Sequence, residues 1–218
     1  MSEKCWRCFR PLKTCYCKDI TPVDTGVKFV FLMHPKEAYK QKTGTGRLAS
    51  LSLADSEIII GVDFTANTRL SDLLADTDTY FPVLLYPAED AWHSDTPTFR
   101  YAIGGRKLLV IVIDATWFFA RKMLFLSRNL QHLPTLSFSK PYRSEFTFKN
   151  QPAPECLSTI ESVYYLTEEL KAGGIARADA DVTGLMEVFH RMIDFQLECE
   201  QRRKETGAAL LHPELFKR

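Results

Sequence analysis

An aspartate lies where an apolar run meets the start of a helical pattern. Residues 108–113 are all apolar, and Asp114, Ala115, Thr116 and Trp117 follow directly. An apolar run rich in β-branched residues predicts a strand that is buried on both faces. Asp114 would then lie at the carboxyl end of that strand, the edge at which open α/β sheets bind ligands. The alternative is structural: Thr116 would be an N-cap, and Asp114 an acid near the positive end of a helix dipole.

A second group of chemically competent residues lies near the start of the chain. Four of the six cysteines follow the pattern C-x2-C-x6-C-x-C: Cys5, Cys8, Cys15 and Cys17. In a cytosolic protein such clustered thiols indicate a metal rather than disulfides, and four thiolates suit one structural zinc ion. An iron–sulfur cluster or a chance grouping are the alternatives. The isolated Cys156 and Cys199 are expected to be small buried hydrophobic residues.

Composition indicates a globular protein with an uneven charge distribution. Of the 218 residues, 45% are hydrophobic and 25% charged. The first residues lack an apolar signal-peptide core and no apolar segment is long enough for a membrane span, so we expect neither signal nor anchor and a cytoplasmic location. Residues 1–50 carry ten basic and four acidic side chains, a balance of +6, and the remainder carries −5. This bias suits a phosphate-binding face, although a solvated surface is the commoner meaning.

The elements that must position these residues alternate along the chain. We expect strands at 26–35, 57–64, 80–87, 107–114 and 134–139. Helices are expected at 45–54, 69–75, 116–127, 158–171 and 184–204, and loops over residues 140–155 and in the polar stretch before Lys107. This alternation predicts an α/β protein with a mostly parallel sheet covered on both faces. We expect a four-cysteine loop at 1–25 and a catalytic domain at 26–218. Neither "TGTGRL" (43–48) nor the glycine pair at 104–105 matches a nucleotide-binding fingerprint.

Several motifs together resemble a known family. They are the four-cysteine loop, T-G-R at 45–47, Y-P-A-E-D at 86–90, D-A-T-W at 114–117, L-P at 133–134, P-Y-R at 141–143 and C-L-S-T-I-E-S at 156–162. In this order they resemble the DTW-domain proteins, the tRNA-uridine aminocarboxypropyltransferases. The resemblance spans nearly the whole chain.

The resemblance implies a reaction, a fold and a partner. The reaction is transfer of the 3-amino-3-carboxypropyl group of S-adenosylmethionine to N3 of a uridine in tRNA, which leaves methylthioadenosine. The implied fold is similar to that of the knotted SPOUT methyltransferases, with the cofactor in loops at the strand ends. The partner is tRNA; neither a membrane partner nor an oligomeric state is implied.

The resemblance also suggests roles for individual residues. Asp114 is our candidate general base for the N3 proton; alternatively it binds the amino group of the transferred moiety or only caps a helix. Trp117 offers a π face, or is a core tryptophan. The guanidinium groups of Arg47 and Arg143 suit a carboxylate or a phosphate. We expect cofactor contacts from Pro87, Thr116, Trp117, Leu133 and Arg143, and substrate contacts from Lys36, Lys40, Lys42 and Arg47. Ser158 and Glu161 fit a capping box, S-x-x-E.

Two other functions fit the same residues. One is a SPOUT-like RNA methyltransferase that uses the same cofactor at a different carbon. The other is a non-catalytic, zinc-bearing RNA-binding module in which Asp114 only caps a helix.

Overall fold

The strands that position the candidate site residues belong to one sheet. The computed structural model describes residues 3–40, 43–146 and 156–207. Within them, parallel strands form a 6-stranded sheet in the order β2-β1-β5-β3-β6-β4. The strands are β1 (Lys28–Met33), β2 (Ser56–Ile60), β3 (Tyr80–Leu85), β4 (Trp92–His93), β5 (Lys107–Asp114) and β6 (Thr135–Ser137). Because the strands are parallel, their carboxyl ends meet at one edge, where Met33 pairs with Asp114.

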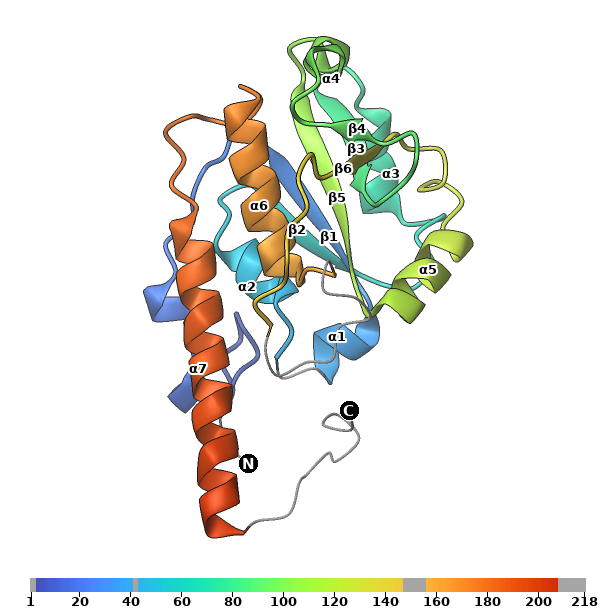
Figure 1. The fold of residues 1–218 in the computed structure, drawn as a ribbon. Helices are drawn as coiled ribbons and strands as arrows, with labels where there is room; N and C mark the ends of the chain where they lie inside the picture. Colours follow the sequence, from blue (N-terminus) through green and yellow to red (C-terminus); the bar gives the residue numbers. More distant parts are fainter. Residues whose placement is uncertain (1–2, 41–42, 147–155, 208–218) are drawn as a thin grey trace.

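Helices cover both faces of the sheet (Figure 1). They are α1 (Pro35–Tyr39), α2 (Gly46–Leu51), α3 (Thr68–Ala75), α4 (Pro97–Ile103), α5 (Trp117–Leu126), α6 (Thr159–Ala172) and α7 (Thr183–Thr206). One core joins Ile111 of β5 to Met123 of α5, and the other joins Val110 of β5 to Leu48 of α2 and Leu166 of α6. This arrangement confirms the predicted parallel α/β fold. In the part of the chain described, no helix combines the length and apolar character that a membrane crossing requires.

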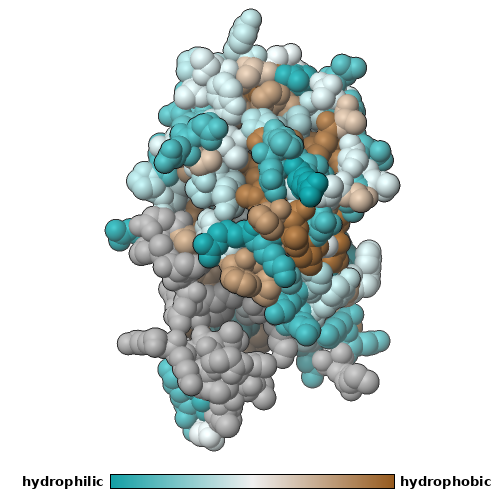
Figure 2. All heavy atoms as spheres, turned by 90° about the vertical axis from the view of Figure 1, so that its right-hand side faces the viewer, coloured by the Kyte–Doolittle hydropathy of each residue, from teal (hydrophilic) through white to brown (hydrophobic). Residues whose placement is uncertain are grey.

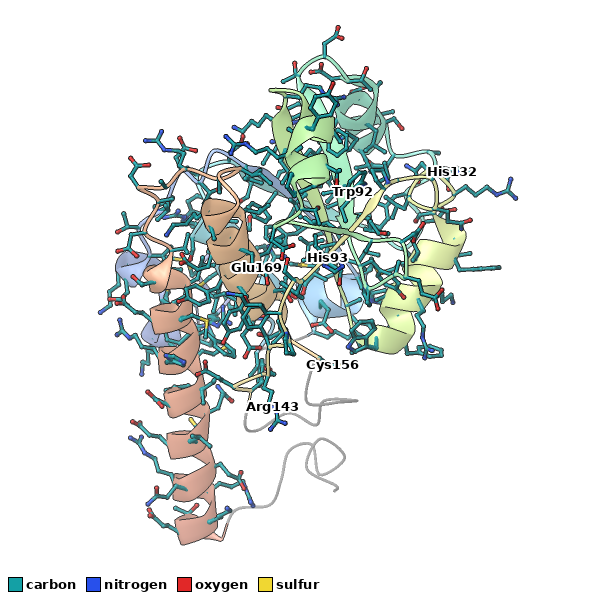
Figure 3. The ribbon with its side chains drawn as sticks, turned by 45° about the horizontal axis from the view of Figure 1, so that its top comes forward. Trp92, His93, His132, Arg143, Cys156 and Glu169 are labelled. Atoms are coloured by element: carbon teal, nitrogen blue, oxygen red, sulfur yellow. The ribbon has the colours of Figure 1, made fainter. Side chains whose placement is uncertain are left out.

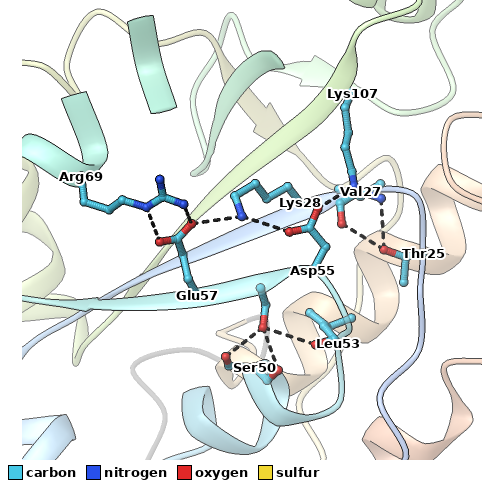
Figure 4. Close-up of polar contacts among 10 residues, drawn as sticks. Thr25, Val27, Lys28, Ser50, Leu53, Asp55, Glu57, Arg69 and Lys107 are labelled. Atoms are coloured by element: carbon cyan, nitrogen blue, oxygen red, sulfur yellow. Dashed lines mark hydrogen bonds and ion pairs between the residues drawn. The ribbon is translucent and has the colours of Figure 1, made fainter. Parts of the chain in front are cut away.

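The opposite, amino edge of the sheet is held by ion pairs (Figure 4). The Lys28 ammonium lies 2.9 Å from Asp55 and 3.0 Å from Glu57, Asp55 also pairs with Lys107, and Glu57 pairs with Arg69 at 2.8 Å. Burial lowers the pKa of Lys28, but the hydrogen bonds to Asp55 and Glu57 outweigh it and raise the pKa overall. Lys28 is therefore part of the fold rather than of the surface charge of residues 1–50.

Several predicted strands are shorter in the structure because turns begin earlier. The strand expected at 26–35 ends at Met33, since Pro35 begins α1 and the His34 ring Nδ1 accepts the Lys36 N–H at 3.1 Å as an N-cap. The strands expected at 57–64, 80–87 and 134–139 end at Ile60, Leu85 and Ser137.

One stretch expected as a loop is partly regular. The polar stretch before Lys107 contains β4 and α4, and α4 has Pro97 at its start and Gly104, with φ 62°, at its end. These are the helix signals that the loop assignment overlooked. The five predicted helices correspond to α2, α3, α5, α6 and α7, with shifted ends.

Candidate active site

Asp114 lies where three elements converge. It is the last residue of β5, its side chain is buried, and its Oδ1 accepts the hydroxyl of Thr159, the first residue of α6, at 2.6 Å. Gly46, the first residue of α2, lies so close that a Cβ there would overlap the carboxylate. The N-cap of α5 is Thr116, whose side chain makes no capping hydrogen bond. The Asp114 carboxylate thus contacts the starts of α2 and α6.

A first cavity opens on the β3, β5 and β6 side of this carboxylate. It has a volume of about 460 Å³, and its lining consists of residues 85–87, 112, 113, 115, 117, 120, 136–142, 157, 159 and 162. Such a volume and a largely apolar wall are typical of small-molecule sites. Trp117 forms part of the wall, and its ring lies 6.3 Å from that of Tyr86. Figure 2 shows hydrophobic residues gathered across the middle of the flank on the side of α5.

A second cavity opens on the other side of Asp114. It has a volume of about 660 Å³, and its wall combines Asp114 with Lys40 and Arg47 and with Phe9 of the four-cysteine loop. Among the described residues the two cavities share no lining residue, yet Thr159 lines the first and Asp114 the second. The hydrogen bond between these two side chains therefore lies between the cavities.

Comparison with known sequences agrees with this arrangement of motifs. Residues 2–197 match the DTW domain, which covers most of the 218 residues. The chain belongs to the DTW-domain family. No solved structure matches the chain.

Relatives of this DTW domain carry a common name, tRNA-uridine aminocarboxypropyltransferase 2. The protein of that name from Drosophila melanogaster is 26% identical over 210 residues, which are 93% of this chain and 80% of the relative. Those from Macaca fascicularis and Mus musculus are 26% and 28% identical and align with 72% of this chain. The aligned part is 53% of each mammalian protein, so the chain spans about half their length.

The residues predicted as cofactor contacts in this DTW domain do not all lie together. Pro87 and Trp117 both line the first cavity. Thr116 is exposed at the start of α5, and Leu133 packs at the edge of the core that contains Met123. Neither is among the residues that line the first cavity. Arg143 is also exposed, and Figure 3 shows it projecting from the body of the molecule.

The predicted substrate contacts divide in a similar way. Arg47 and Lys40 line the second cavity, whereas the Lys36 ammonium lies over the Phe119 ring at 4.5 Å, outside the described lining. Lys42 lies outside the described residues. The Arg47 guanidinium lies 4.1 Å from the Phe9 ring centroid and donates to the Ala38 carbonyl at 3.3 Å.

The four cysteines of the DTW domain form one cluster that could hold a metal ion. Their sulfur atoms all lie within 4.8 Å of one another, with Cys5 3.7 Å from Cys17 and Cys8 3.6 Å from Cys15. A tetrahedral zinc ion with bonds of about 2.3 Å needs sulfur atoms about 3.8 Å apart, so the donor set fits zinc. The backbone N–H of Cys8 lowers the pKa of Cys5 to about 6, while burial raises the pKa of Cys15.

The prediction that both isolated cysteines are buried was wrong for Cys199, and Cys156 is only partly buried. Cys199 is exposed on α7, because the C-terminal part of this long helix extends beyond the sheet (Figure 1). Cys156 is half-buried just before α6.

Two buried glutamates of α6 were not recognised as part of the site. Glu169 accepts the backbone N–H groups of Ser139 at 2.9 Å and Lys140 at 3.2 Å, and the Tyr142 hydroxyl at 3.0 Å. It also accepts a hydrogen bond from the hydroxyl of Ser94 at 3.1 Å. Figure 3 labels Glu169 and His93, the residue that precedes Ser94. Burial and the adjacent Glu169 raise the pKa of Tyr142. Glu169 thus anchors the segment that forms one wall of the first cavity.

Glu161 has a similar anchoring role in the first turn of α6. It is fully buried and accepts the N–H of Ser158 at 2.7 Å, which is the glutamate half of the predicted capping box. It also accepts the Glu145 N–H at 2.6 Å and the Ser144 hydroxyl at 2.9 Å. The sequence indicated only the capping role of Glu161, through its i, i+3 spacing from Ser158. The contacts of Glu161 and Glu169 with residues 139–145 are long-range, and no local pattern predicts them.

Proposed function

We propose that this DTW-domain protein transfers the 3-amino-3-carboxypropyl group of S-adenosylmethionine to N3 of a uridine in tRNA. Family membership and the name of the relatives support the class of reaction. The observation that carries the proposal is the position of Asp114, a buried carboxylate at the carboxyl edge of a parallel sheet with a cavity on either side. Two cavities beside one carboxylate suit a reaction between a small donor and a nucleotide.

The chemistry requires a proton acceptor beside the reacting nitrogen. Uridine N3 carries a proton, and Asp114 takes this proton as N3 attacks the sulfonium-bound carbon of the donor. The N3–carbon bond forms as the carbon–sulfur bond breaks, and the electron pair of that bond returns to sulfur, giving neutral methylthioadenosine. The Thr159 hydroxyl, 2.6 Å from Asp114, holds the carboxylate in position.

The first cavity is the proposed donor site. Pro87 and Trp117 line it, and the aromatic face of Trp117 suits an adenine ring or a sulfonium cation. Thr116, Leu133 and Arg143 stay predictions for this site. A SPOUT-like knotted fold stays a prediction; a cavity at the strand ends of a parallel sheet is compatible with it.

We also propose zinc as the metal of the four-cysteine cluster. Cys5, Cys8, Cys15 and Cys17 supply four sulfur ligands, so the ion has no open position and holds structure. The division into a zinc loop at 1–25 and a catalytic domain at 26–218 belongs to this proposal.

The test is to incubate the purified protein with S-adenosylmethionine and with tRNA isolated from cells that lack this protein. Nucleoside mass spectrometry should detect aminocarboxypropyl-uridine, with methylthioadenosine formed in equal amount. Methylated nucleoside with S-adenosylhomocysteine would instead identify a methyltransferase. Tight tRNA binding without either product would identify a non-catalytic module.

A further inference from the structure

The second cavity has walls from three distant parts of the chain. The four-cysteine loop contributes Phe9, the α1–α2 region contributes Tyr39 and Arg47, and α7 contributes Phe195. Asp114 is also among its lining residues. A cavity of about 660 Å³ at this place is large enough for a ligand and reaches the proposed base.

The wall combines exposed aromatic rings with basic groups. Phe9 is 47% exposed and Tyr39 is 68% exposed, although both are large rings that a fold would normally bury. Lys4 and Lys40 lie on the same wall, and Arg47 stacks on Phe9. Flat aromatic rings beside cations are the chemistry that recognises an unstacked base and its phosphates.

Phe9 is held in a backbone conformation that phenylalanine rarely adopts. Its φ is 60°, the left-handed region, and it is the one residue other than glycine with positive φ in the described part of the chain. The turn is fixed because the Phe9 N–H donates to the Cys5 carbonyl at 2.8 Å and the Cys5 N–H donates to the Arg10 carbonyl at 2.8 Å. Glycine would fit this turn without strain, so the ring itself indicates a role in binding.

We propose that this cavity takes one uridine nucleotide, turned out of the tRNA stack, with its base against Phe9 and Tyr39 and its phosphates near Lys4 and Lys40. The proposal rests on the proposed function and adds a binding site to it: the four-cysteine loop forms part of the acceptor site. An enzyme that acts on N3, an atom used in base pairing, must reach an unpaired base. The base then approaches Asp114 from this cavity, with N3 beside the carboxylate and facing the reacting carbon of the donor.

The decisive variant is Phe9→Gly, because it removes the ring and relieves the backbone strain. We expect its thermal unfolding temperature to be unchanged or raised, and its affinity for unmodified tRNA to fall roughly tenfold. Tyr39→Ala should act in the same direction, and Phe9→Tyr should retain binding. Tyr101→Ala is the matched control, because Tyr101 is 89% exposed on α4, far from the cavity. Affinity for S-adenosylmethionine should be unchanged in all four.

Filter-binding measurements with radiolabelled tRNA give the affinities, and tRNA containing 4-thiouridine should crosslink to the peptides that hold Phe9 or Tyr39. Unchanged tRNA affinity in both Phe9→Gly and Tyr39→Ala, or crosslinks confined to α3 and α5, would overturn the site. The proposed function fails separately: if the wild type makes no aminocarboxypropyl-uridine while Phe9→Gly still weakens tRNA binding, the reaction is wrong and the nucleotide site stands.

Discussion

At the scale of single residues, the environment of Asp114 is built from both strand and helix ends. The sequence predicted its place because a six-residue apolar run of 108–113 can only be a buried strand or part of a buried helix, and the next residues begin a helical pattern. Thr159 and Gly46 were not predicted as its neighbours. They reach Asp114 through the packing of α6 and α2 on the sheet, and no local pattern encodes contacts across 45 or more residues.

Asp114→Asn separates a base from a structural acid. Asparagine keeps the size and still accepts the Thr159 hydroxyl, but it cannot take a proton. We expect turnover to fall by roughly 100-fold or more with the unfolding temperature nearly unchanged. The assay follows methylthioadenosine at saturating donor, with donor affinity measured in parallel. Turnover near that of the wild type would remove the base assignment, and lost donor affinity would make Asp114 a binding residue.

Gly46→Ala tests the close approach of α2 to the carboxylate. Alanine favours a helix over glycine by about 1 kcal/mol, so propensity alone predicts a more stable protein. The Cβ would overlap the Asp114 carboxylate, and we expect lower stability and a large loss of activity. Gly184→Ala in α7 is the control, because a Cβ there meets nothing within 4 Å. A Gly46→Ala protein as stable and active as the control would show that the approach is not needed.

At the scale of elements, α6 supplies the acceptors that hold the neighbouring loop. The sequence contains no sign of how residues 139–145 are held, because the acceptors are Glu161 and Glu169 on a helix whose sequence pattern is ordinary and amphipathic. Five helices were predicted correctly because their apolar period is local, whereas α1 and α4 were not predicted. The short α4 was missed because its capping signals, Pro97 and Gly104, lie in a polar stretch.

Glu169→Gln should loosen the wall of the first cavity. One oxygen is replaced by a donor, so one or two of the N–H and O–H groups from Ser139, Lys140, Tyr142 and Ser94 lose their acceptor. We expect a stability loss of about 1–3 kcal/mol and weaker donor binding by calorimetry, with tRNA affinity retained. Glu168→Gln, on the exposed side of α6, is the matched control. Equal donor affinities in the two variants would contradict the anchoring role.

The four-cysteine loop allows a test by metal removal. We expect one zinc ion per chain by metal analysis, and its loss on Cys8→Ser substitution. Far-ultraviolet circular dichroism and donor binding should stay close to the wild type, because the core between β5 and α5 contains no residue of the loop, while tRNA affinity should fall. Cys199→Ser, an exposed cysteine on α7 that is not one of the four cluster residues, should change neither. A metal-free wild type with freely titratable thiols would refute the assignment.

At the scale of the whole molecule, the charge balance of the first fifty residues needs the structure to interpret it. Lys28 lies in the ion-pair network of the amino edge, and Arg10 is buried with its guanidinium on the Gly44 carbonyl, so neither adds to an exposed basic face. Lys40 and Arg47 line the second cavity, and so does the buried Arg10. A count of charges could predict the sign of this region but not which side chains the fold buries.

Replacing Lys36, Lys40 and Lys42 together by glutamine tests the basic face. We expect weaker tRNA binding and a shallower dependence of log affinity on log salt, by about 0.7–0.9 for each phosphate that is no longer neutralised. Donor affinity should not change. Lys171→Gln serves as the control, because that lysine pairs with Glu168 on α6. The same slope in the triple variant and the wild type would show that these lysines lie outside the tRNA footprint.

The separate linings of the two cavities bear on how such a protein changes over evolutionary time. Because the described walls have no residue in common, a substitution that alters recognition of one substrate leaves the side chains around the other in place. With tRNA in the second cavity and the donor in the first, as proposed, selection can change the RNA target through the four-cysteine loop, α1 and α7 while the wall of the first cavity is preserved. Under this assignment the two binding specificities can change independently, and the Asp114–Thr159 hydrogen bond links their sites.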